Sequence, residues 1–204
     1  MGPVGLAAIA LLLAGCATTP SAGSAEALLG GGPSPSPEAT VEPPAGSWNG
    51  VTPPEGYRAV LVVAGDDPAT TTIAAAVEGW AVDHEVEIDR LDADDDTQVL
   101  ARLEEADGLD ADLVIGAGAG VVDEFSYATA QRLDQQFLVV GAQLGEPTRN
   151  VTAVVWPGAT FRGTGITDDE QDAAAVTPEA AGDAVDAGVA SVLAGLTGIV
   201  LALP

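Results

Sequence analysis

Side chains able to act as nucleophiles or to bind transition metals are scarce in this chain. Its 204 residues include one cysteine, Cys16, and one histidine, His84. His84 stands between Asp83 and Glu85, with no second histidine and no cysteine near it in the sequence, so a zinc site is not expected. A nucleophilic dyad or triad built on cysteine or histidine lacks partners for the same reason. We therefore expect no catalytic residue, no metal and no cofactor, and a protein that is not an enzyme.

One acidic run begins in the same way as a calcium-binding loop. Asp92, Asp94 and Asp96 are spaced as the first three ligands of such a loop. Thr97 stands where the loop requires glycine, however, and Leu103 stands where it requires glutamate. We interpret the run as a solvated turn that begins a helix.

A glycine-rich run follows one of the apolar segments. Gly116, Gly118 and Gly120 alternate with alanine, whereas the third glycine of a dinucleotide-binding loop would fall on Val121. We interpret the run as a tight turn between a strand and a helix. Its backbone N–H groups could still lie close to an anion.

The N-terminal segment indicates export and lipidation. Val4 to Leu13 is an uncharged apolar run of about ten residues, which suits a signal peptide and is too short to span a membrane. The following Leu13-Ala14-Gly15-Cys16 resembles the lipobox of bacterial lipoproteins. That resemblance implies cleavage after residue 15 and a diacylglycerol on the Cys16 sulfur, with two or three acyl chains holding the protein firmly at the membrane. A plain secretory signal followed by a chance cysteine is the alternative. We expect a lipid anchor on the extracytoplasmic face of the cell membrane.

The composition restricts what the chain can bind through charge. It has 31 Asp and Glu residues against 6 Lys and Arg, a formal net charge of -25. Nucleic-acid binding is not expected, because neutralising phosphates requires clustered basic residues. Anionic lipid headgroups would also repel the chain, so the acyl anchor has to provide the membrane attachment.

Residues 16–56 are rich in Pro, Gly, Ser and Ala and show no apolar periodicity. Prolines at 33, 35, 37, 43 and 44 disfavour a helix or a central strand. The composition predicts a disordered tether that holds a domain away from the membrane. Trp48 is its one large apolar residue, and it either docks on the domain or stays free.

Residues 57–204 have the length of a single domain, in which apolar runs alternate with amphipathic segments. The expected strands are Arg58–Ala64, Glu85–Leu91, Asp112–Gly116, Gln136–Gly141, Asn150–Trp156 and Gly198–Leu203. The expected helices are Pro68–Val82, a segment from the Asp94–Thr97 cluster to Gly108, a segment from Val121 to Leu133, and a segment from Thr177 to Leu196.

This alternation predicts an α/β fold, a single three-layer lobe with a doubly wound, mainly parallel sheet. If the expected strands are numbered along the chain, the first five should lie side by side in the sheet in the order 2-1-3-4-5. Ligands of such sheets bind at the carboxyl ends of the strands. The loops expected to face a ligand there contain Asp66, Asp67, Gly116, Gly118 and Gly141.

The stretch from Ala111 to Gly163, with its DLVIGAGAGVVDEF and NVTAVVW segments, resembles the first lobe of the basic membrane protein family. These are purine-nucleoside-type solute-binding lipoproteins of ABC importers with a type I periplasmic-binding fold. The resemblance implies that fold, a nucleoside-like ligand and an ABC permease as partner. It covers one lobe of the two that the family has. Gly141 replaces an acid that the family uses on its ligand, and Gly65 to Pro68 replaces a loop that carries an aromatic residue.

Two functions are compatible with these observations. The first is a non-catalytic interaction or envelope lipoprotein that retains the lobe without its ligand. The second is a nucleoside-like binding or sensing component associated with an ABC importer, acting alone or as a dimer whose second copy supplies the missing wall. The predicted ligand-facing loops offer neither a basic residue nor an aromatic one. A monomer should therefore bind nucleosides no more tightly than about millimolar.

Overall fold

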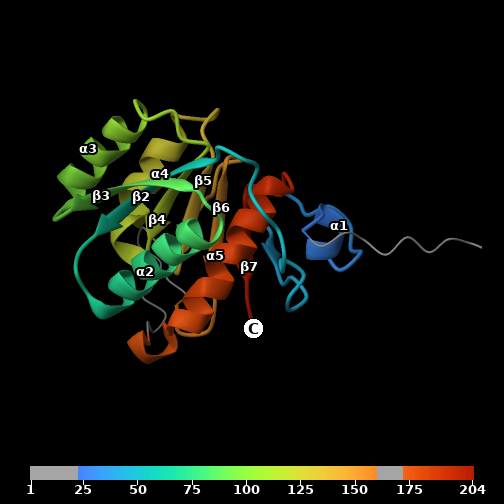
Figure 1. Ribbon diagram of the computed structural model, residues 1–204. Helices are drawn as coiled ribbons and strands as arrows, with labels where there is room; N and C mark the ends of the chain where they lie inside the picture. Colours follow the sequence, from blue (N-terminus) through green and yellow to red (C-terminus); the bar gives the residue numbers. More distant parts are fainter. Residues whose placement is uncertain (1–22, 160–171) are drawn as a thin grey trace, which may run out of the picture.

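The computed structural model describes residues 23–159 and 172–204, and Figure 1 shows a sheet with helices on both of its faces. The predicted signal peptide (1–15), the lipobox residues Leu13, Ala14 and Gly15, and the lipidation site Cys16 lie outside the described residues. Within those residues, no helix is long and apolar enough to cross a membrane.

In the described part of the chain, seven strands form one sheet in which all neighbours are parallel. They are β1 Thr40–Val41, β2 Arg58–Ala64, β3 Glu87–Ala93, β4 Leu113–Ala117, β5 Phe137–Val140, β6 Val151–Val155 and β7 Ile199–Ala202. Their order is β1-β7-β6-β5-β4-β2-β3. The predicted α/β class is confirmed. The order predicted for the first five strands is also confirmed, because it corresponds to β3-β2-β4-β5-β6.

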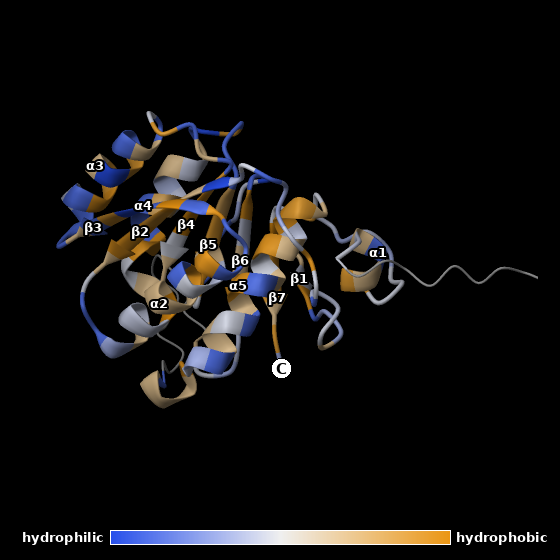
Figure 2. Cartoon of the chain, viewed as in Figure 1, coloured by the Kyte–Doolittle hydropathy of each residue, from blue (hydrophilic) through white to orange (hydrophobic). Residues whose placement is uncertain are grey.

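Helices cover both faces of the sheet. Helices α2 Pro68–Asp83 and α5 Pro178–Leu193 pack on one face, and α3 Asp96–Ala106 and α4 Val122–Thr129 pack on the other. Two short 3-10 turns, η1 Ala119–Val121 and η2 Ala173–Ala175, lie in the connections. Every residue of β4, β5 and β6 is buried, because helices cover both sides of these strands. Figure 2 shows the result as apolar strands beneath helices with more polar outer surfaces.

The helices begin at residues that the sequence marks as caps. Asp95 accepts a hydrogen bond from the backbone N–H of Gln98 at 2.9 Å, and Thr177 accepts one from that of Ala180 at 3.2 Å. The acidic run from Asp92 to Asp96 therefore ends β3 and begins α3, as expected of a solvated turn. In the described residues, no three His, Cys, Asp or Glu side chains are grouped so that they could hold a metal ion.

Several element boundaries differ from the expectation by a few residues, among them those of β3 and α4. Strand β3 begins at Glu87 rather than Glu85, because Glu85 has a positive φ of 55° that belongs to a turn and not to a strand. Helix α4 ends at Thr129, so Leu133 lies beyond it and is 43% exposed. Nearby, the buried amide of Asn150 lies 2.9 to 3.2 Å from three backbone oxygens and ties this turn to the start of β6.

Residues 23–56, here called the strap, are packed against the lobe, whereas the sequence predicts that they belong to a disordered tether. A short helix, α1 Ala25–Leu28, buries Leu28 completely, and Trp48 is 4% exposed. Strand β1 pairs in parallel with β7, and the backbone N–H of Glu38 donates to Gly198 O at 2.8 Å. The expectation fails here because the strap gains its order from long-range contacts. Two large side chains and a two-residue strand leave no periodic pattern in the sequence.

Candidate functional site

The carboxyl ends of the parallel strands meet at one edge of the sheet, here called the carboxyl edge. Strands β2 and β4 are neighbours, and the helices that follow them, α2 and α4, lie on opposite faces. A crevice is expected where the connections diverge in this way, and ligands of open α/β sheets commonly bind there. Several hollows lie along this edge in the described structure, among them one between the loops after β2, β4, β5 and β6 and one at the ends of β6 and β7.

The first hollow, the switch-point crevice, has a volume of about 150 Å³ and lies between the loops after β2, β4, β5 and β6. Its walls approach closely because glycines line it. A Cβ on Gly118 would lie 2.8 Å from Thr70 Oγ1, and one on Gly141 would lie 2.5 Å from Ile73 Cδ1. Gly118 and Gly141 also have positive φ angles of 73° and 81°, which L side chains rarely adopt. These glycines are explained by close packing of the loops.

The N-terminus of α2 borders this crevice, and it already holds a carboxylate. Asp67 Oδ1 accepts hydrogen bonds from the backbone N–H groups of Ala69 and Thr70, both at 3.0 Å. Burial by itself would raise the pKa of Asp67, but hydrogen bonds from the Thr70 side chain and from these N–H groups outweigh it and lower the pKa. Asp67 is therefore charged at neutral pH and opposes the binding of phosphate or carboxylate at this helix end.

Three of the five residues predicted to face a ligand line this crevice: Asp67, Gly118 and Gly141. Asp66 lies on a separate shallow surface beside Arg90. Gly116 lies within β4, where a Cβ would lie 2.7 Å from Val121 Cγ2. Glycine at this position therefore allows the following helical segment to pack closely against the strand.

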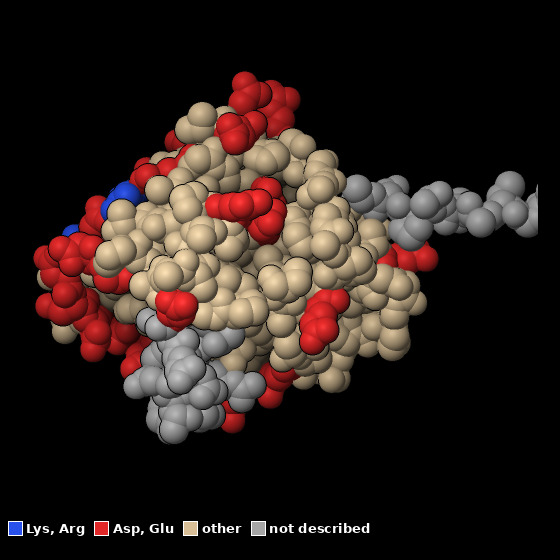
Figure 3. Space-filling view, turned by 90° about the horizontal axis from the view of Figure 1, so that it is seen from below, with Lys and Arg blue, Asp and Glu red and all other residues tan. Residues whose placement is uncertain are grey.

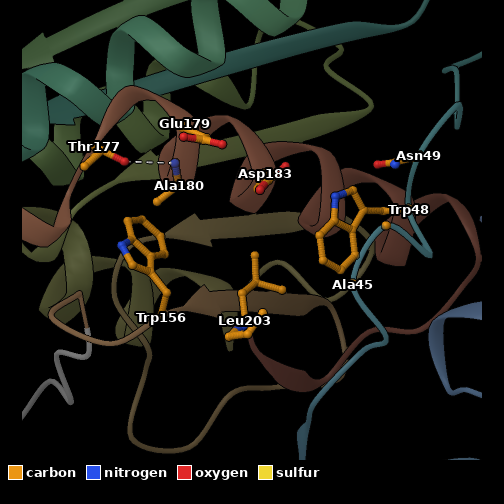
Figure 4. Close-up of a pocket in the computed structure, with 11 residues that line it drawn as sticks. Ala45, Trp48, Asn49, Trp156, Thr177, Glu179, Ala180, Asp183 and Leu203 are labelled. Carbon is orange, nitrogen blue, oxygen red and sulfur yellow. Dashed lines mark hydrogen bonds between the residues drawn. The ribbon is translucent and has the colours of Figure 1, made fainter.

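The second hollow, here called the tryptophan pocket, has a volume of about 410 Å³ and lies between the strap and the lobe. Figure 4 shows the indoles of Trp48 and Trp156 on opposite sides of it, with Leu203 between them. Trp48 comes from the strap, whereas Trp156 and Leu203 immediately follow β6 and β7. The first turns of α5 form the remaining wall.

Hydrogen bonds between distant segments of the chain hold these walls in place. The Nε1–H of Trp156 donates to Ala175 O at 3.0 Å, and the backbone N–H of Leu203 donates to Val155 O at 2.8 Å. Trp48 is as buried as Trp156, but its Nε1–H has no hydrogen-bond acceptor among the described residues. A buried donor without an acceptor costs about 1–3 kcal/mol, so this group calls for an explanation.

Two carboxylates stand on the α5 wall of the pocket. Glu179 and Asp183 are one helical turn apart, both are exposed, and neither forms a salt bridge with a described residue. No arginine of the described part of the chain lines the pocket. Figure 3 views the molecule from the side on which β7 ends, and the Lys and Arg atoms visible on that face lie only at its margin. The potential in this pocket is therefore negative.

The sites predicted from the sequence do not include this pocket. The sequence places Trp48 in a predicted tether and Trp156 at the end of a predicted strand. The loops predicted to face a ligand contain no aromatic residue, but Trp156 follows β6 and reaches the same edge, where a Cβ on Gly141 would lie 3.3 Å from Trp156 Cη2. The one available signal was Trp48 itself, the one aromatic residue of the predicted tether.

Comparisons with known proteins find partial matches to several solved structures. No protein-family model and no curated protein matches this chain. An ABC transporter solute-binding protein from Aeropyrum pernix K1 is 15% identical with a TM-score of 0.43, over 50% of this chain and 28% of that one. A putative lipoprotein fragment from Peptoclostridium difficile 630 is 13% identical with a TM-score of 0.44, over 48% of this chain and 84% of the fragment.

A second ABC solute-binding protein, from Conexibacter woesei DSM 14684, is 17% identical with a TM-score of 0.40, over 50% of this chain. The matched region spans only 28% and 35% of the two solute-binding proteins. These values leave the particular family unspecified, so the resemblance to the basic membrane protein family remains a prediction.

Proposed function

We propose that this protein is a lipid-anchored binding protein on the extracytoplasmic face of the cell membrane, and that it catalyses no reaction. The lipobox-like Leu13-Ala14-Gly15-Cys16 supports the anchor and the location. Its ligand, either a small molecule or an exposed group of an envelope component, enters the carboxyl edge of the lobe.

The tryptophan pocket is the observation that carries this proposal. Its volume of about 410 Å³ falls within the ~300–1,000 Å³ typical of small-molecule sites. It combines large apolar surfaces from Trp48 and Trp156 with a few polar groups, as such sites do. Its walls come from the strap, α5 and the ends of two strands, so the pocket depends on the folded lobe as a whole.

Nucleoside binding in the switch-point crevice is not supported by the geometry. The crevice volume, about 150 Å³, is below the ~300–1,000 Å³ range of small-molecule sites. Asp67 also occupies the helix end that would otherwise attract a phosphate. We predict that the monomer binds adenosine, guanosine and inosine in this crevice no more tightly than about millimolar.

A solute-binding or sensing component of an ABC importer is the second candidate function. The two indole walls of the tryptophan pocket favour it, because they provide apolar surface for a small ligand. Copurification of the full-length protein from cross-linked native membranes with an ABC permease would support this candidate. Copurification with another envelope protein would support the interaction function instead.

The proposed function can be tested by screening the full-length protein in detergent against nucleosides, sugars, amino acids and amines by thermal shift. A ligand at a hundred times its dissociation constant should stabilise the fold by about 2.7 kcal/mol. The stabilisation should disappear in Trp156→Ala and persist in Trp80→Phe, since Trp80 lies on α2 and does not line the pocket. If no compound stabilises the protein, or if Trp156→Ala responds as the wild type does, the tryptophan pocket is not a binding site.

A further inference from the structure

The chemistry of the tryptophan pocket restricts the ligand that it can hold. Glu179 and Asp183 place two negative charges on one wall, and no basic side chain of residues 23–159 or 172–204 lines the pocket with them. An anionic ligand would be repelled there, and a neutral ligand would gain little from the two exposed carboxylates. An ammonium ion is attracted by both of them.

The aromatic walls favour the same kind of ligand. Trp48 and Trp156 stand on opposite sides of the pocket in Figure 4. Indole is the side chain with the strongest attraction for a cation over its face, and paired aromatic walls are a recurring way of holding organic ammonium groups. The same rings and Leu203 provide apolar surface for a hydrocarbon body.

The unpaired N–H of Trp48 indicates that the ligand also carries a hydrogen-bond acceptor. Trp48 is 4% exposed, and its Nε1–H has no acceptor in the described structure. In Figure 4 this nitrogen lies on the edge of the indole that is turned toward Asp183, on the α5 side of the pocket. An N–H group needs an acceptor, which an ammonium group is unable to supply. Because this atom is buried, a ligand reaches it only if the Trp48 side chain turns toward the pocket, and a neutral oxygen is then the acceptor that the two carboxylates do not repel.

We infer that the tryptophan pocket binds an organic ammonium ion that carries a neutral oxygen acceptor close to the charge, as in an amino alcohol with an apolar body. The ammonium group lies between the indoles and pairs with Glu179 and Asp183. The oxygen accepts the hydrogen bond from Trp48, and the apolar body contacts Trp156 and Leu203. This inference rests on the proposed function, because it assumes that the pocket receives a ligand.

Three matched probes separate these contributions in isothermal titration of the full-length protein in detergent. The probes are 2-amino-1-phenylethanol, its neutral counterpart 1-phenyl-1,2-ethanediol, and 2-phenylethylamine, which has the charge but lacks the hydroxyl group. The amino alcohol should bind at least about tenfold more tightly than the neutral diol, and several-fold more tightly than the amine without the hydroxyl. Raising the salt concentration should reduce this preference for the cation. Equal binding of the amino alcohol and the diol would overturn the inference.

Variants of the pocket test the role of each group. Glu179→Gln combined with Asp183→Asn should weaken binding of the amino alcohol about tenfold and leave binding of the diol unchanged. Glu104→Gln removes an exposed charge on α3, away from the pocket, and serves as the control. Trp48→Phe keeps an aromatic ring without the N–H, so the preference for the amino alcohol over 2-phenylethylamine should disappear. Urea unfolding of each variant shows whether the fold is retained.

Failure of this inference is distinguishable from failure of the proposed function. If a sugar or an amino acid binds with dependence on Trp156 while the amines do not, the inferred ligand class is wrong and the binding function stands. If none of the probes or screened compounds binds, both are wrong. Unchanged binding of the amino alcohol to the double variant would overturn the charge assignment.

Discussion

Tyr57 is a buried phenol at the start of the lobe, just before β2. It is 7% exposed, and the carboxylate of Asp112 lies nearby, where it accepts a hydrogen bond from the backbone N–H of Arg58 at 2.9 Å. Burial first, and the charge of Asp112 second, raise the pKa of Tyr57 to about 12. In the unfolded chain the same phenol ionises near its ordinary value of about 10.

This difference predicts how the stability of the fold changes at high pH. Because the folded state disfavours ionisation, the contribution of Tyr57 is complete below about pH 10 and is lost as the pH rises toward 12. Urea unfolding at increasing pH should show a decline in the free energy of unfolding that is smaller in Tyr57→Phe. Tyr127→Phe is the control, since Tyr127 is 65% exposed. An identical decline in wild type and Tyr57→Phe would contradict the prediction.

At the scale of one element, helix α5 contains two glycines in contrasting surroundings. A Cβ on Gly182 would meet no atom within 4 Å. A Cβ on Gly188 would lie 2.5 Å from Leu138 Cδ1 and 2.9 Å from Val154 Cγ2, both of which belong to the sheet beneath the helix. Gly188 therefore permits close approach of α5 to the sheet, whereas Gly182 has no such role.

The two glycines should respond to alanine in opposite directions. Gly182→Ala should stabilise the protein by about 0.5–1 kcal/mol, because alanine is the better helix former. Gly188→Ala should destabilise it by about 1–3 kcal/mol, because the added methyl group overpacks the core. The midpoints of urea unfolding measure both effects. A stabilising Gly188→Ala would show that α5 does not lie as close to β5 and β6 as the structure has it.

The strap gives a second prediction at this scale. Leu28 is completely buried, and the neighbouring Leu29 is partly exposed. If the strap is docked, Leu28→Ala should destabilise the protein by about 2–5 kcal/mol, and Leu29→Ala should have a clearly smaller effect. A disordered strap would make both substitutions neutral. Chemical denaturation of the two variants therefore distinguishes a docked strap from the tether that the composition alone suggests.

At the scale of the whole molecule, negative charge is unevenly distributed. Figure 3 shows Asp and Glu crowding the side that carries β3 and α3, with fewer over the remainder of the face in view. The salt bridges of Arg58, Arg90 and Arg102 also lie in this region and offset only part of the charge. A molecule with a net charge of -25 is repelled by anionic lipids, so the membrane attachment proposed above requires a covalent anchor.

The proposed anchor predicts the behaviour of one variant. Cys16→Ser removes the sulfur that would carry the diacylglycerol, and the protein should then leave the membrane fraction or remain unprocessed. Detergent phase partitioning and the mass of the purified protein measure this. The proposal of lipidation would fail if the variant partitioned into detergent as the wild type does.

The sequence by itself determined the architecture of the lobe. The apolar runs at β2, β4, β5 and β6 and the capping residues before the helices are local signals, because strand burial and helix initiation depend on neighbouring residues. Parallel strands joined by helices then restrict the strand order to few arrangements, and the predicted order is observed. The candidate loop residues Asp67, Gly118 and Gly141 followed from this order, since it places the carboxyl ends of the strands together.

Only the tertiary structure decided that the strap packs against the lobe and where the tryptophan pocket lies. Strand β1 is two residues long and gains its stability from β7, far along the chain, and Leu28 and Trp48 are ordered by surfaces that other elements provide. The tryptophan pocket unites Trp48, Trp156 and the first turns of α5, which are separated by long stretches of sequence. Composition and periodicity report on neighbours in the chain, whereas the free energy that orders these groups comes from contacts between distant segments.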